Sequence, residues 1–123
     1  MKVKFALGLL ALAIAISPFT VFAADEAKTK TLTGEPVDIN CYLTGKSGEG
    51  HAGCATACAN RGNPIGFVVK DGDKTHMYLV IGSGGKQAKD VIAAHMGKQV
   101  KVTGKVSKKD GMNIIAVEEV SEA

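Results

Sequence analysis

Apolar and polar residues alternate in several short segments of the chain, a pattern that predicts a protein built mainly from β-strands. Within residues 32–43, apolar side chains occupy every second position at Val37, Ile39, Cys41 and Leu43. A period of two places such side chains on one face of a strand. We therefore expect the first strand to lie here, with Cys41 on its apolar face.

Four further segments are rich in β-forming residues and are arranged as two pairs. Each pair flanks an Asp-Gly dipeptide, which favours a tight hairpin turn. The segments are residues 64–69, 76–81, 100–106 and 112–120. The sequence therefore predicts two β-hairpins after the first strand.

Two segments are expected to be helical. Residues 51–62 contain four alanines and end at Gly62, a common residue at helix C-termini. In residues 86–96, the side chains with helical spacing are Ala88, Val91, Ile92 and His95. Gly97 is the expected stop of this second helix.

The predicted order is a strand, a short cysteine-containing helix, two strands, a helix and two strands. Without the short helix, this is the order of the OB fold, a five-stranded Greek-key barrel. We therefore predict a mainly β, OB-fold-like domain over residues 32–123. Residues 24–31 are polar and contain lysines, so we expect them to form a flexible lead into this domain.

Four short segments add a family resemblance: DINCYL at 38–43, HAGCATAC at 51–58, PIGFV at 64–68 and GKQVKVTGK at 97–105. They resemble segments of a largely uncharacterised group of small secreted bacterial OB-fold proteins. The resemblance covers most of the chain after the N-terminal segment. It implies the fold and an export route, and it supplies no biochemical activity.

The N-terminal residues 1–23 have the order of a secretory signal peptide. Lys2 and Lys4 precede an apolar run at residues 5–16, and small residues then provide a cleavage site at Ala23. The apolar run is shorter than the roughly 20 residues that a spanning helix requires. We therefore predict a periplasmic or secreted protein with no membrane anchor in the mature chain.

The charge balance argues against a nucleic-acid partner. The chain has 15 basic and 12 acidic residues, but Lys2 and Lys4 belong to the predicted signal peptide. A nearly neutral domain has little attraction for a phosphate backbone. Among the strands that bind oligonucleotides in OB folds, only Phe67 and Tyr78 offer aromatic rings for stacking.

The predicted domain contains three cysteines, an odd number for a compartment that permits disulfides. His51, Cys54 and Cys58 are spaced to share one face of a helix. If this helix folds back onto the first strand, Cys41 joins them. Three thiolates and one imidazole suit a soft metal ion such as Cu(I) or Zn(II). The sequence therefore predicts a metal site formed by these four residues.

Two other interpretations of the cysteines remain open. In the first, two cysteines form a disulfide that staples the loop to the barrel of an interaction module, which binds a protein, peptide or glycan. In the second, Cys54 or Cys58 is the exchange thiol of a redox protein, although Cys-x-x-x-Cys lacks the thioredoxin-like spacing. No catalytic residues are indicated, so we expect a binding protein and not an enzyme.

Overall fold

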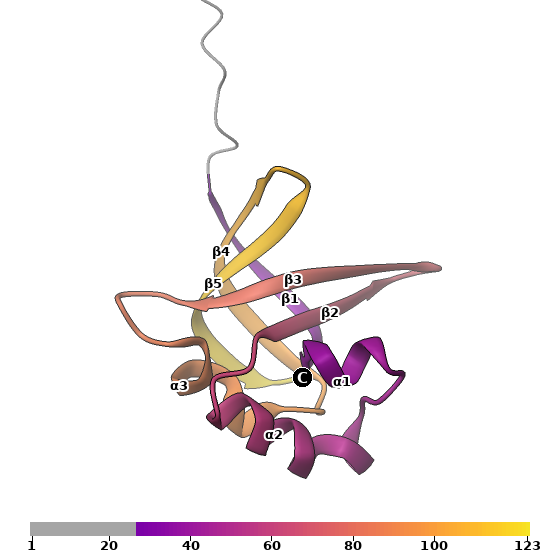
Figure 1. Ribbon diagram of the computed structural model, residues 1–123. Helices are drawn as coiled ribbons and strands as arrows, with labels where there is room; N and C mark the ends of the chain where they lie inside the picture. The colour runs from indigo at the N-terminus through magenta and orange to yellow at the C-terminus, as the bar shows by residue number, and fades with distance from the viewer. Residues whose placement is uncertain (1–26) are drawn as a thin grey trace, which may run out of the picture.

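Five strands close into a small barrel in the order β1-β2-β3-β5-β4 (Figure 1). The structure, a computed structural model, describes residues 27–123, so the predicted signal peptide lies outside the described residues. The strands are β1 (Lys28–Asp38), β2 (Ile65–Asp71), β3 (Lys74–Gly82), β4 (Val100–Lys109) and β5 (Met112–Glu122). This arrangement confirms the predicted mainly β, OB-fold-like barrel.

The barrel closes because β1 pairs with two different strands. The first part of β1 lies antiparallel to β4, from Lys28 opposite Val106 to Gly34 opposite Val100. Its last part lies antiparallel to β2, where Asp38 is opposite Ile65. β3 and β5 pair in parallel and complete the circle. Closure of this kind removes the open sheet edges at which other strands add.

The start of β1 corrects the expected flexible lead at residues 24–31. Residues 24–26 lie outside the described part, but Lys28 to Thr31 pair with β4 as regular strand. Their side chains are polar and exposed, so no apolar pattern marked them. Backbone hydrogen bonds hold this segment in the sheet, and such bonds form with any side chain except proline.

Short helices cover one end of the barrel. They are α1 (Ile39–Leu43), the 3₁₀ turn η1 (Glu49–His51), α2 (Ala52–Asn60), α3 (Ala88–Ile92) and the 3₁₀ turn η2 (Ala93–His95). α1 and α2 lie at the end opposite the turn between β4 and β5 (Figure 1). The two predicted helices are present as α2 and α3, each shorter than expected. α2 begins after η1 and ends at Asn60, whereas α3 begins at Ala88 and continues as the 3₁₀ turn η2.

Apolar packing sets the position of α2. Ala55 and Ala59 are 5% and 0% exposed and belong to the same core cluster as Phe67 and Ile92. Between them, the Thr56 hydroxyl donates to the Ala52 carbonyl oxygen at 2.8 Å and lies 3.4 Å from the Ala93 carbonyl oxygen of η2. The small alanine side chains allow α2 to approach the barrel closely. This packing fixes the position of the opposite, outer face of α2.

A close contact at Gly97 fixes the loop that precedes α2. The Gly97 N–H donates to the Pro36 carbonyl oxygen at 2.9 Å, and its φ of +75° lies in the left-handed region. A Cβ atom at this position would lie 2.6 Å from the Gly48 carbonyl oxygen and 3.0 Å from Ala52 Cβ. Glycine is therefore required both by its backbone angle and by the space available.

We expect Gly97→Ala to lower the free energy of unfolding by about 1–3 kcal/mol, because the added methyl group is strained and pushes against the Gly48 loop. Urea denaturation measures this change. Gly53→Ala is the matched control, because Gly53 lies in α2 with nothing within 4 Å of an added Cβ. The control should unfold at the same or a slightly higher urea concentration. Equal loss of stability in both variants would contradict the account of Gly97.

Candidate metal centre

Cys41 lies in α1 and not on the predicted strand. Asp38 ends β1 and caps the helix, because its Oδ1 atom accepts a hydrogen bond from the Cys41 N–H at 2.8 Å. A carboxylate at this position satisfies one of the free N–H groups at a helix start. The chain therefore turns after Asp38. Leu43, which was expected on the apolar face of the strand, is 77% exposed.

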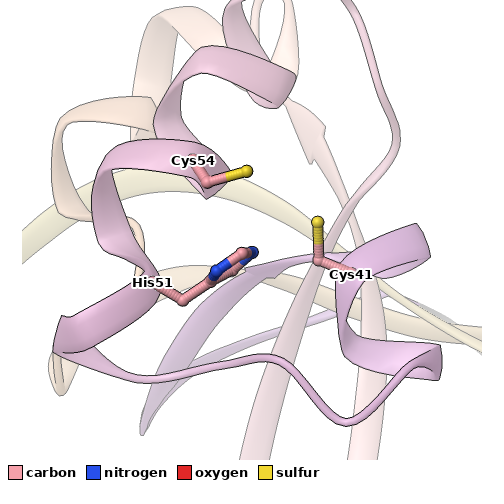
Figure 2. A group of neighbouring side chains, drawn as sticks. All are labelled: Cys41, His51 and Cys54. Carbon is pink, nitrogen blue, oxygen red and sulfur yellow. The ribbon is translucent and has the colours of Figure 1, made fainter.

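His51 and Cys54 face Cys41 from the start of α2 (Figure 2). His51 ends η1, and its N–H donates to the Gly48 carbonyl oxygen at 3.0 Å. One ligand atom from each of Cys41, His51 and Cys54 lies within 4.8 Å of the others. Figure 2 shows the imidazole ring pointing toward the space between the two sulfur atoms. We refer to these three residues as the His51 group.

Cys58 belongs to a second group that also contains Cys41. Its sulfur, the Cys41 sulfur and a carboxylate oxygen of Asp38 lie within 4.8 Å of one another. We refer to these three residues as the Asp38 group. The four predicted ligands are thus distributed over two groups that share Cys41. His51 at the N-cap of α2, Cys54 and Cys58 all approach Cys41, but neither group contains all four predicted ligands.

Asp38 is the residue that the sequence analysis missed. It is buried, with 1% of its surface exposed, at the junction of β1 and α1. An aspartate three residues before Cys41 is a recognisable helix-capping signal. The alternation of apolar residues through this segment favoured a strand instead and hid that signal.

Two buried side-chain atoms have no hydrogen-bond partner within residues 27–123, and both lie beside Cys41. They are His51 Nε2 in the His51 group and Asp38 Oδ2 in the Asp38 group. Leaving a buried polar atom without a partner costs about 1–3 kcal/mol. Imidazole nitrogen and carboxylate oxygen are both metal ligands. The cluster therefore offers metal-ligating atoms without hydrogen-bond partners, and a bound cation would engage them.

The three cysteines are free thiols, and Cys41 is the most perturbed of them. The neighbouring Asp38 carboxylate, desolvation and the negative charges of Cys58 and Cys54 raise the pKa of Cys41 to about 12. Burial raises the pKa of Asp38, but the polar groups of Cys41, Asn63 and Asn40 around the carboxylate together hold it below its ordinary value. At neutral pH, an ionised carboxylate therefore lies beside a protonated thiol, and a metal ion binding Cys41 must displace that proton.

A scan against models of protein families and a search of curated proteins both find no match for this chain. Within the part of the chain that the structure describes, no helix has the length and apolar character needed to cross a membrane. The function must therefore be argued from the cluster itself.

We expect Cys41 of the reduced, metal-free protein to react with iodoacetamide much more slowly than the exposed Cys54 at about pH 8, because the thiolate is the reactive form. The rate at Cys41 should rise with pH toward its raised pKa of about 12. Asp38→Asn removes the carboxylate that favours the protonated thiol, so it should speed this reaction at least about tenfold.

Mass spectrometry of the alkylated peptides gives the rate at each cysteine separately. The Cys54 rate in the same sample is the internal control, because Cys54 does not belong to the Asp38 group. Equal rates at Cys41 and Cys54 in the unmodified chain would contradict the pKa assignment.

Proposed function

We propose that this protein is exported and carries a soft metal ion, Cu(I) or Zn(II), through the cluster formed by Cys41, His51, Cys54 and Cys58. One observation carries the proposal. The buried Nε2 atom of His51 has no hydrogen-bond partner among the described residues, and its ring lies with the Cys41 and Cys54 sulfurs in a group whose ligand atoms are within 4.8 Å. A metal ion at this point would bind all three.

The ligand types define the class of ion. Two thiolates and one imidazole favour Cu(I) or Zn(II), whereas Ca²⁺ and Mg²⁺ require mostly oxygen ligands. The His51 group contains two sulfurs and one nitrogen donor. Soft or borderline ions are therefore the expected cargo.

The exposure of the site favours a carrier over a structural metal site. Structural zinc sites are closed by four protein ligands, whereas the His51 group supplies three and Cys54 is exposed to solvent. The core of the barrel, including the buried alanines of α2, is formed by apolar packing. A bound ion is thus not needed to hold the barrel together, and it remains accessible for exchange with a partner.

Export adds a chemical reason for a bound ion. Residues 1–23 have the signal-peptide pattern, and four segments of the domain resemble small secreted OB-fold proteins. Outside the cytoplasm, neighbouring thiols oxidise to disulfides unless something protects them. Metal binding would keep Cys41, Cys54 and Cys58 as thiolates in that compartment.

The two rival functions depend on different thiol chemistry. A redox protein needs Cys54 or Cys58 as an attacking thiol of lowered pKa, and the raised pKa of Cys41 makes Cys41 itself unsuitable for that role. A disulfide between Cys41 and Cys54 or Cys58 would remove two metal ligands at once. The protein would then be the disulfide-stapled interaction module. No redox reaction is needed for the proposed role, which is binding and not catalysis.

We expect the reduced full-length domain to bind Cu(I) or Zn(II) under anaerobic conditions and to release it to a strong chelator without unfolding. Cys41→Ser should cause the largest loss of affinity, because Cys41 belongs to both groups. His51→Asn and Cys54→Ser should each weaken binding by more than the roughly 10–100-fold that loss of a supporting residue costs at a metal site. Competition with chromophoric Cu(I) and Zn(II) chelators measures these affinities.

His76→Asn is the matched control for His51→Asn, because His76 is also half-buried but lies in β3, outside both groups. Its affinity should equal that of the unmodified protein. Circular dichroism of each variant verifies the fold. Failure of the reduced protein to bind either ion would refute the carrier proposal. Protein purified from the exported fraction with a reductant-sensitive disulfide and no metal would refute it as well.

A further inference from the structure

The Asp38 group has the features of a second binding position beside the first. Cys41 is common to both groups, so an ion bound in the Asp38 group would be the immediate neighbour of an ion in the His51 group. The His51 group approaches Cys41 from the first turn of α2, whereas Cys58 approaches from the last. The two groups are thus separated along α2 and meet only at the Cys41 sulfur.

Asp38 is held rigidly in this second group. It lies in the closed barrel opposite Ile65 of β2, and only 1% of its surface is exposed. Its Oδ1 atom is engaged by the Cys41 N–H at 2.8 Å, whereas its buried Oδ2 atom has no hydrogen-bond partner within the described residues. A buried, fixed carboxylate oxygen without a partner is able to bind a cation, and this distinguishes Asp38 from a mobile carboxylate on the surface.

Cys58 is also held in position. The buried alanines at positions 55 and 59 fix the helix on either side of it, and the side chain itself is half-buried. Nη2 of Arg61 donates to the Cys58 sulfur at 3.4 Å. This contact and the helix packing together fix where the Cys58 sulfur lies.

The donor atoms of the Asp38 group differ from those of the His51 group. Two sulfurs and one carboxylate oxygen suit Zn(II), which accepts cysteine and aspartate ligands together. Cu(I) prefers sulfur and imidazole, and Ca²⁺ or Mg²⁺ would not select two thiolates. The carboxylate therefore makes this position selective between the two ions that the His51 group accommodates.

We propose that Asp38, Cys41 and Cys58 form a second metal position selective for Zn(II), and that the Cys41 sulfur bridges it to a Zn(II) ion in the His51 group. This inference rests on the proposed function, because Cys41 is a ligand in both positions. A thiolate sulfur has more than one lone pair and binds two zinc ions at once. The protein thus holds two Zn(II) ions per chain, or one Cu(I) ion in the His51 group.

Anaerobic titration of the reduced full chain with Zn(II), followed by native mass spectrometry, counts the bound ions. The unmodified chain should bind two. Asp38→Asn and Cys58→Ser should each bind one, and both should retain Cu(I) binding with an affinity within a few fold of the unmodified chain. Asparagine also caps helices, so Asp38→Asn preserves the start of α1. His51→Asn should also bind one Zn(II), in the Asp38 group.

Asp73→Asn is the matched control for Asp38→Asn, because Asp73 is exposed in the turn between β2 and β3 and belongs to neither group. It should bind two Zn(II) ions. ¹¹³Cd(II) serves as an NMR-active substitute for Zn(II). Two ¹¹³Cd resonances of equal intensity, coupled to each other through the shared sulfur, are expected in the unmodified chain, and one in Asp38→Asn.

The possible outcomes separate this inference from the function on which it rests. A single Zn(II) ion in the unmodified chain, or two in Asp38→Asn and in Cys58→Ser, would overturn the second position while leaving a carrier with one site. Two ¹¹³Cd resonances without mutual coupling would overturn the bridging role of Cys41. Binding of neither Zn(II) nor Cu(I) by the reduced protein would refute the carrier function itself.

Discussion

The hydrogen bond from the Cys41 N–H to the Asp38 carboxylate determines how the whole cluster is built. It ends β1 at the rim of the barrel and starts α1, so Cys41 leaves the sheet and turns toward α2. The same carboxylate acts on the Cys41 thiol and raises its pKa. One aspartate therefore controls both the position of the shared ligand and the proton that a metal ion must displace from it.

The barrel serves as a scaffold that does not depend on the cluster. β1 pairs along its length with β4 and β2, and the alanines on the inner face of α2 pack into the core. The outer face of α2 then offers His51, Cys54 and Cys58 toward α1 without contributing them to the core. Separation of these two roles would let ligands at the rim bind and release an ion while the fold stays intact, as the proposed carrier requires.

The barrel order followed from sequence pattern because each hairpin combined two segments of β-forming residues with an Asp-Gly turn. The start of β1 could not be predicted in this way. Lys28 and its neighbours pair with β4 through the backbone, and their side chains form no apolar pattern. The cysteines and His51 were identified by residue type and spacing, but their division into two groups depends on the angle between α1 and α2. Asp38 was missed because alternation through Ile39 and Cys41 imitates a strand, whereas a single capping bond decides the local structure.

X-ray absorption spectroscopy at the zinc edge tests the central claim most directly, because it identifies the atoms bound to the ion. The reduced protein, loaded anaerobically with one equivalent of Zn(II), should show a mixed shell of sulfur at about 2.3 Å and nitrogen or oxygen at about 2.0–2.1 Å. The sulfur contribution should fall in Cys41→Ser. A shell of nitrogen and oxygen alone in the unmodified protein would show that the zinc is bound elsewhere, and would contradict the assignment of this cluster as a metal centre.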